Sequence, residues 1–436
     1  MKIAVWGEEL SAWVACAQLA SYGNTVYLAQ GGTEPATSQL RSEPGLLSAL
    51  QNASFSERLL VSEEAAIQAE VHWLSMSPDA AESALELVER IASASKGPLL
   101  IVNQSNFGVG MCDRMQALLS SDLQQVIYLP DLLQAGQAMQ QFVNPEALLI
   151  GTESAAAKAQ LLALLRPFHL GQRTIQQMTC REAEFVKYAI TGLLALRLGY
   201  INEMAGLCDQ LNLDMDAIRR GMSTDKRIGT HYLQPGCGFG GLQFTQYLQG
   251  LAELLTGRRG SVLIDTVLAQ NEVNKEWPFR TIWQHYNCNL SGRKVAIWGA
   301  AFKAGVADID NAPALRVIDA LLAQGAHICV HDPEAMQALA DRYAHAPGLS
   351  LATSAYEASV GADALMLLTD WPEYGSPDFP RLKQAMREAL IIDGRNLYDP
   401  QRVQQEGFAY YTRGRNCLSQ SASLSEQSTS EQRQPA

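Results

Sequence analysis

The first 28 residues contain two strand-like patterns with a helical pattern between them, and few folds have strands and a helix at this spacing. Ile3–Trp6 form a short apolar run, a helical pattern follows through Trp13 and Leu19, and Thr25–Leu28 form a second apolar run. A strand, a helix and another strand at this spacing are typical of a parallel βαβ unit. We therefore expect the chain to begin with an α/β domain built on a doubly wound parallel sheet.

A similar pattern returns near residue 293, after a long helical stretch. Residues 182–208 form the longest uninterrupted helical pattern, with glycine only at 192, 199 and 206, and residues 293–299 begin a second αβ pattern. A chain of 436 residues is too long for a single core. We expect two Rossmann-like doubly wound domains joined by a long central helix and a helical region, with boundaries at 1–180, 181–288 and 289–415. Residues 416–436 are mostly polar, and we expect a disordered tail there.

Composition and charge exclude several classes of function. A net charge of −12 argues against a nucleic-acid or anionic-membrane partner, since either would require a basic face. The eight cysteines form no C-x-x-C pair and have no histidine at ligand spacing, so we expect reduced thiols and no metal site. The chain shows no signal-peptide pattern and no apolar run near the roughly 18 residues of a membrane span. These features predict a cytoplasmic protein.

The first strand-to-helix turn departs from the dinucleotide-binding fingerprint. That fingerprint is G-x-G-x-x-G, followed by an acidic residue at the end of the second strand. Here Gly7 is present and Ala12 is tolerable, but Glu9 replaces the glycine that lets the backbone approach a pyrophosphate. The second strand ends at Gln30, which has no carboxylate for the ribose hydroxyls. A Rossmann-like fold with lost or weakened NAD binding is therefore expected.

A glycine-rich segment lies between two helical patterns in the middle of the chain. Residues 236–241 read Gly-Cys-Gly-Phe-Gly-Gly, so four of six positions are glycine. Such a segment either brings its backbone close to another group or turns with positive φ. It is therefore a tight connection or the lining of a site, and spacing alone does not separate the two.

Together with several other motifs, this segment resembles the active-site loop of the UDP-glucose/GDP-mannose dehydrogenase family. The resemblance covers roughly residues 1–412 in the family's order. It implies an NAD-dependent oxidation of a UDP- or GDP-sugar for polysaccharide biosynthesis, by a dimer built on the central helix. The further motifs that carry it are Glu43-Pro44-Gly45-Leu46, Arg227-Ile228-Gly229, Ala301-Phe302-Lys303, Asp308–Pro313, His331-Asp332-Pro333 and Asp393-Gly394-Arg395-Asn396.

The resemblance places the family's catalytic groups on positions that mostly differ here. The catalytic cysteine falls on Gln243, the lysine on Lys187 and the asparagine on Thr191. The threonine and glutamate that serve the catalytic water fall on Asn106 and Ala135. An amide is not a useful nucleophile. We therefore expect the family's chemistry to be lost.

Cys237 does not replace the missing nucleophile. It stands six residues before the usual position, on the other side of the Gly240-Gly241 turn. Reaching the same sugar carbon from there would require a rebuilt loop.

The resemblance also implies where a sugar nucleotide would bind. The ligand would lie on the C-terminal domain, and Arg227 would reach it from the other subunit of the dimer. Asp310 stands where the family has an arginine, which predicts weaker affinity. The residues expected to line the site are Arg227, Tyr232, Gly238, Gly240, Gly241, Lys303 and Arg395.

Three functional hypotheses remain open from the sequence. The first is a pseudoenzyme that binds a sugar nucleotide, as a homodimer or in a hetero-oligomer with an active relative. The second is an oxidoreductase that transfers a single hydride without a covalent step. The third is a structural or interaction protein without a ligand. Bound NAD would indicate the second, and a bound sugar nucleotide separates the first from the third.

Overall fold

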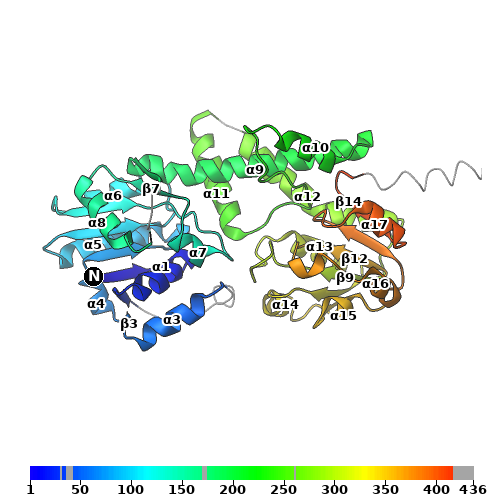
Figure 1. Cartoon of the computed structure of the whole chain (residues 1–436), viewed down its shortest axis with the longest axis horizontal. Coiled ribbons are helices and arrows are strands. Elements are labelled where there is room, and N and C mark those ends of the chain that lie inside the picture. Colours follow the sequence, from blue (N-terminus) through cyan, green and yellow to red (C-terminus); the bar gives the residue numbers. More distant parts are fainter. Residues whose placement is uncertain (30–31, 36–42, 169–173, 260–261, 416–436) are drawn as a thin grey trace, which may run out of the picture. The chain divides into compact units, whose positions relative to one another are not determined.

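The computed structural model describes residues 1–29, 32–35, 43–168, 174–259 and 262–415 (Figure 1). The chain divides into two compact units, Met1–Ile190 and Thr191–Ala436. The predicted tail at 416–436 and the position of Gln30 lie outside the described residues.

The first unit contains an eight-stranded sheet with the order β3-β2-β1-β4-β5-β6-β7-β8. Neighbouring strands are parallel except β6 and β7, which are antiparallel and paired through Tyr128 and Gly151. The order of the first six strands is that of the dinucleotide-binding fold, which confirms the expected doubly wound α/β domain. The strands are β1 (Lys2–Trp6), β2 (Thr25–Leu28), β3 (Leu59–Val61), β4 (Val71–Leu74), β5 (Leu99–Asn103), β6 (Gln124–Tyr128), β7 (Ala147–Gly151) and β8 (Thr174–Met178).

Helices cover both faces of this sheet. Alternate residues of β1 divide between two apolar clusters, with Ile3 and Val5 in one and Ala4 and Trp6 in the other. The strands are therefore buried on both faces, which explains their continuous apolar runs. The described helices of this unit are α1 (Leu10–Ser21), α3 (Leu46–Phe55), α4 (Glu63–Ile67), α5 (Ala81–Ala94), α6 (Met111–Ala117), α7 (Ala138–Val143), α8 (Ala155–Leu165) and the start of α9 (Cys180–Leu211).

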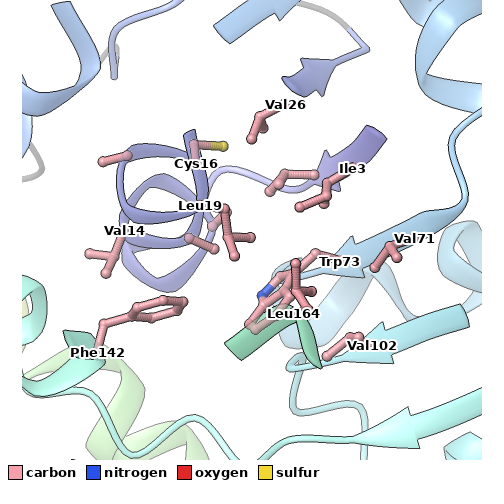
Figure 2. Packing of buried hydrophobic residues seen from close by; sticks show 14 of the residues in the cluster. Ile3, Val14, Cys16, Leu19, Val26, Val71, Trp73, Val102, Phe142 and Leu164 are labelled. Atoms are coloured by element: carbon pink, nitrogen blue, oxygen red, sulfur yellow. The ribbon is translucent and has the colours of Figure 1, made fainter. Parts of the chain in front are cut away.

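The larger cluster holds α1 against the sheet. All residues of α1 from Ser11 to Ala20 are buried, because α3 and α7 pack against the helix as well. Figure 2 shows side chains of this cluster, including Leu19 of α1 with Trp73 of β4 and Phe142 of α7. The last two rings are tilted, with centroids 6.0 Å apart. This packing fixes the turn between β1 and α1.

The second unit begins with helices and continues α9 as one uninterrupted helix (Figure 1). Glycines let its neighbours approach closely. A Cβ on Gly192 would lie 2.6 Å from Leu251 in α11, and one on Gly199 would lie 3.5 Å from Val267 in α12. The glycines within the predicted helix are thus contact points and do not break it. The other helices here are α10 (Met215–Ser223), α11 (Leu242–Arg259) and α12 (Leu263–His285).

A six-stranded parallel sheet completes the second unit, with the order β11-β10-β9-β12-β13-β14. This order repeats that of the first six strands of the N-terminal sheet, so the expected second Rossmann-like domain is confirmed. Its strands are β9 (Lys294–Trp298), β10 (His327–His331), β11 (Leu349–Leu351), β12 (Ala364–Leu367), β13 (Leu390–Asp393) and β14 (Ala409–Thr412). Its helices are α13 (Pro313–Ala323), α14 (Met336–Arg342), α15 (Ala355–Ser359), α16 (Phe379–Ala385) and α17 (Pro400–Gln405). Within the described parts of the chain, no helix is long and apolar enough to cross a membrane.

Candidate functional site

The turn between β1 and α1 is shaped by packing on the end of β4. Gly7 has φ 115°, and a Cβ there would lie 1.8 Å from the carbonyl oxygen of Ser75. The hydroxyls of Ser11 and Ser75 hydrogen-bond at 2.5 Å, and Ala12 is buried in the apolar cluster. Close approach within the protein therefore explains the glycine and the alanine without any ligand.

Glu9 is the N-terminal cap residue of α1. Its φ of −67° and ψ of 161° are extended values that need no glycine, and its side chain does not cap the helix. The residue is half-buried, and its backbone oxygen accepts from Ala12 N at 3.0 Å. An anion at a helix N-terminus is stabilised by the backbone amides and the helix dipole. A glutamate as the cap residue fits a pyrophosphate poorly, because its negative charge would repel the phosphates.

Lys187 lies in the first unit and binds the main chain beyond β6. Its Nζ donates a hydrogen bond to the carbonyl oxygen of Asp131. Burial lowers the pKa of Lys187, although the negative charge of Asp131 opposes part of the shift. Nearby in sequence, Ala135 stands in the turn that the family would use for its glutamate. The main chain of the segment that contains Ala135 therefore holds Lys187 in place.

Glu43 has a clear structural role that sequence reasoning did not assign. The side chain is buried, and its two carboxylate oxygens accept from Gly136 N at 2.5 Å and from Met139 N at 3.3 Å. It therefore fixes the turn after β6 that contains Ala135. Hydrogen bonds from two backbone amides offset the free-energy cost of burying a carboxylate. The only signal in the sequence was the Glu-Pro-Gly-Leu motif itself.

The glycine-rich loop of the second unit is anchored at almost every residue. Gly236 N donates to Asn202 Oδ1 at 2.8 Å and Cys237 N to the carbonyl oxygen of Gly394 at 2.8 Å. Phe239 exchanges two hydrogen bonds with the side-chain amide of Asn271, at 2.9 and 3.0 Å. The loop is therefore held by α9, by α12 and by the segment after β13.

Each predicted glycine of this loop meets protein atoms. A Cβ on Gly238 would lie 2.9 Å from Asn271 Oδ1, and one on Gly240 would lie 2.7 Å from the carbonyl oxygen of Asn311. Gly241 has φ 89° and faces the ring of Phe302 at 3.1 Å. The interpretation as a tight connection accounts for all three glycines. A ligand above the loop would meet a rigid backbone.

A buried lysine lies beneath the loop. The side chain of Lys275 is 2% exposed, and its Nζ donates to Glu272 at 2.7 Å and to Asn311 Oδ1 at 2.6 Å. Asn311 in turn donates from Nδ2 to Thr245 Oγ1 at 2.6 Å. This chain of hydrogen bonds joins α12, the segment before α13 and the first turn of α11. Lys275 and Asn271 were not predicted, because a polar residue in a helical pattern does not reveal its partner.

Arg395 closes the loop from the C-terminal sheet. Its guanidinium donates to three backbone carbonyl oxygens, those of Leu368 at 2.7 Å, Phe302 at 3.3 Å and Gly238 at 3.4 Å. Lys303 is half-buried, with Nζ 5.7 Å from the centroid of the Phe302 ring. Arg395 therefore organises the loop.

The position expected for the nucleophile lies at the start of α11. Gln243 is exposed as the second residue of that helix, and Tyr247 is buried one turn later. Cys237 is fully buried, and a Cβ on Gly394 would lie 2.8 Å from its Sγ. Burial raises the pKa of the Cys237 thiol. The structure therefore gives Cys237 a packing role.

Two further predicted residues lie on the segment before the loop. Arg227 is exposed and pairs with Asp225 at 2.6 Å, and Tyr232 is partly exposed with φ 59°. Thr191, in contrast, is buried in α9 at 4% exposure. An exposed Arg227 is compatible with the expectation that it serves a second subunit, which remains a prediction.

Sequence profiles of three domains match the chain in order. They describe the UDP-glucose/GDP-mannose dehydrogenase family's NAD binding domain at residues 35–169, its central domain at 181–276 and its UDP binding domain at 296–400. A UDP-glucose 6-dehydrogenase from Pseudomonas aeruginosa is 34% identical over 442 residues, 95% of this chain and 98% of that protein. The chain belongs to this family. The match to the NAD binding domain begins after Gly7, Glu9, Ala12 and Gln30.

Further proteins are similar to this chain in sequence or in fold. A UDP-glucose 6-dehydrogenase from Rhizobium meliloti is 32% identical over 333 residues, 74% of this chain and 75% of that protein. Among solved structures, a UDP-glucose dehydrogenase from Pyrobaculum islandicum has a TM-score of 0.81 at 24% identity, over 94% of this chain and 97% of that one. The UDP-D-ManNAc dehydrogenase from Pyrococcus horikoshii has a TM-score of 0.79 at 22% identity, over 95% and 99%. These two structures confirm the fold.

Proposed function

We propose that this chain is a catalytically silent member of the family that retains a binding site for a UDP- or GDP-sugar. The proposal rests on Gln243, the second residue of α11, which stands where the resemblance places the family's catalytic cysteine. Cys237, the nearest thiol in sequence, is fully buried against Gly394. Loss of a nucleophile from a cooperative site costs on the order of 10⁴ to 10⁶ in rate.

Several other groups of the family's site differ as well. Oxyanion stabilisation requires donors, of which Lys187 remains while Thr191 stands at the asparagine position. Water activation requires groups that are here Asn106 and Ala135. The first experiment is therefore an assay of NADH formation with UDP-glucose, on the unmodified chain and on Gln243→Cys. We expect no turnover from either protein, and robust turnover by the unmodified chain would overturn the proposal.

The binding half of the proposal rests on the C-terminal sheet and the glycine loop. In open α/β sheets, ligands bind at the carboxyl ends of the strands. Lys303 follows the carboxyl end of β9, whereas Lys294 begins the same strand at its other end. The rigid loop at Gly238–Gly241 is anchored to the segments that follow β9 and β13. A nucleotide diphosphate at this edge would meet the ammonium of Lys303.

Calorimetry with UDP-glucose, UDP and GDP-mannose tests this site directly. We expect binding to the unmodified chain and clearly weaker binding to Lys303→Ala, because a cation beside the diphosphate is lost. Lys294→Ala is the matched control, since it removes the same charge from the opposite end of β9. If no sugar nucleotide binds at millimolar concentration, the hypothesis of a structural or interaction protein takes over. If NADH forms without a covalent intermediate, the result supports the hypothesis of an oxidoreductase that transfers a single hydride.

A further inference from the structure

The ammonium group of Lys275 begins a chain of hydrogen bonds that runs in one direction. Its Nζ donates to Asn311 Oδ1 at 2.6 Å, and Asn311 Nδ2 donates to Thr245 Oγ1 at 2.6 Å. Thr245 Oγ1 in turn donates to the carbonyl oxygen of Gly241 at 3.1 Å. An ammonium can only donate, so it fixes Oδ1 of Asn311 toward Lys275 and leaves Nδ2 to Thr245. The chain therefore ends on the main chain of the glycine loop.

The burial of Lys275 makes this arrangement dependent on its partners. The side chain is 2% exposed, and its other hydrogen bond goes to Glu272 at 2.7 Å. The side chain of Glu272 is 53% exposed, so solvent screens the attraction between the two charges. An apolar side chain of similar volume would fill the same space without the cost of removing a charge from water. The contribution that we expect from the ammonium is therefore the orientation of Asn311 more than stability.

The aliphatic stem of Lys275 also contacts the glycine loop. A Cβ on Gly238 would lie 3.1 Å from Lys275 Cγ and 2.9 Å from Asn271 Oδ1. Asn271 lies one turn before Lys275 on α12, and its side-chain amide exchanges two hydrogen bonds with Phe239. Consecutive turns of α12 therefore hold the loop, and Lys275 joins both of them to Asn311.

The segment that follows β9 meets the loop next to Asn311. The carbonyl oxygen of Asp310 accepts from Gly241 N at 3.0 Å. The ring of Phe302 lies 3.1 Å from the position of a Cβ on Gly241. Lys303 follows Phe302 directly in the chain. The position of Lys303 therefore depends on contacts between this segment and the loop that Asn311 helps to fix.

We propose that Lys275 is a positioning residue for the sugar nucleotide. It acts through Asn311, and it holds the glycine loop and Lys303 in the arrangement that the ligand meets. Because Lys275 is buried beneath the loop, it acts without touching the ligand. The inference rests on the proposed function for the identity of the ligand, whereas the arrangement itself is a property of the free protein.

Calorimetry with UDP-glucose on single variants tests the proposal. Lys275→Met keeps an aliphatic stem, and Asn311→Gly removes the amide while it tolerates the φ of 54° found there. We expect each variant to bind at least about tenfold more weakly, as after the loss of a hydrogen bond to a charged group. Lys294→Met is the matched control, because it removes the same charge and a hydrogen bond from Nζ to the carbonyl oxygen of Val360 at 2.6 Å. This control should bind as the unmodified chain does.

The double variant Lys275→Met, Asn311→Gly separates an effect of position from an effect of charge. If Lys275 acts through Asn311, the double variant should bind no more weakly than the weaker of the two single variants. If the two losses multiply, Lys275 acts independently of Asn311 and the proposal is wrong. It is also wrong if Lys275→Met binds UDP-glucose as tightly as the unmodified chain. Urea unfolding of each variant confirms that it is folded.

Hydrogen exchange of the ligand-free protein tests the arrangement itself. Mass spectrometry of peptides that cover residues 238–245 reports on the amide of Gly241, whose acceptor is the carbonyl oxygen of Asp310. We expect faster exchange there in Lys275→Met and no change in Lys294→Met. If the unmodified chain binds no sugar nucleotide, the proposed function fails and this exchange alone decides whether Lys275 positions the loop. Unchanged exchange in Lys275→Met would contradict the proposal in either case.

Discussion

At the residue scale, we predict that Glu9 weakens the binding of NAD to the first unit. Glu9 is the N-terminal cap residue of α1, and a helix N-terminus is where a pyrophosphate would lie. At about 4 Å and an effective dielectric near 20, two like charges repel by on the order of 4 kcal/mol, close to a thousandfold in affinity. We therefore predict that NAD binding is absent or weak and that Glu9→Gly strengthens it. Isothermal titration measures this, with Glu8→Gly as the control that should change little. Micromolar NAD binding by the unmodified chain would contradict the prediction.

A second prediction at this scale concerns Asp308, before the segment that anchors the glycine loop. Burial, together with the charge of Asp310, raises its pKa to about 6 from an ordinary value of 3.8. The folded state then binds the proton more tightly than the unfolded state, so the contribution of Asp308 to stability falls as pH rises from about 4 to about 6.

Asp308→Asn removes this titration and keeps an oxygen that can accept from Asp310 N. We predict that the free energy of unfolding of the variant, relative to that of the unmodified chain, rises as the pH is raised from 4 to 7. The gain should be on the order of 1–2 kcal/mol after allowance for solvent screening. Urea unfolding at several pH values measures it. Asp341→Asn changes an exposed carboxylate and serves as the control. If the difference in free energy of unfolding between the variant and the unmodified chain stays the same across this pH range, the pKa of Asp308 is not raised in the folded protein.

At the element scale, glycine-to-alanine substitutions can be compared at a crowded position in the glycine loop and at an open position in α10. A Cβ on Gly240 would meet the main chain of Asn311 and Ala312 at 2.7 and 2.9 Å, whereas one on Gly221 meets nothing within 4 Å. We predict that Gly240→Ala destabilises by about 1–3 kcal/mol, because the main chain must move. Gly221→Ala should stabilise α10 by about 0.5–1 kcal/mol. Urea unfolding compares the two, and equal effects would show that the loop is looser than its contacts indicate.

At the scale of the whole molecule, α9 exposes an apolar stripe in the second unit. Leu193, Tyr200 and Leu207 recur every seven residues and are 60%, 53% and 44% exposed. Apolar stripes of this kind on soluble proteins mark interfaces between chains. We therefore predict a dimer that forms through α9, as the resemblance implies, with this chain or an active relative as the partner.

Light scattering at micromolar concentration tests the dimer. We expect twice the mass of one chain for the unmodified protein and a monomer for the double variant Leu193→Asp, Tyr200→Asp. Phe55→Asp is the control, because Phe55 is 89% exposed on α3, which belongs to the first unit and not to the stripe. A monomer in the unmodified protein would leave Arg227 without a second subunit to serve.

The sequence by itself determined the two Rossmann-like doubly wound domains, the long α9 and the family, because hydrophobic periods and motif order are local properties of the chain. Only the tertiary structure decided what individual residues contact. It assigns the glycines at 238, 240 and 241 to packing, Arg395 to backbone carbonyl oxygens, and Lys275 to Asn311. Such pairings join segments far apart in the sequence, and a side chain carries no local mark of the partner that folding brings to it.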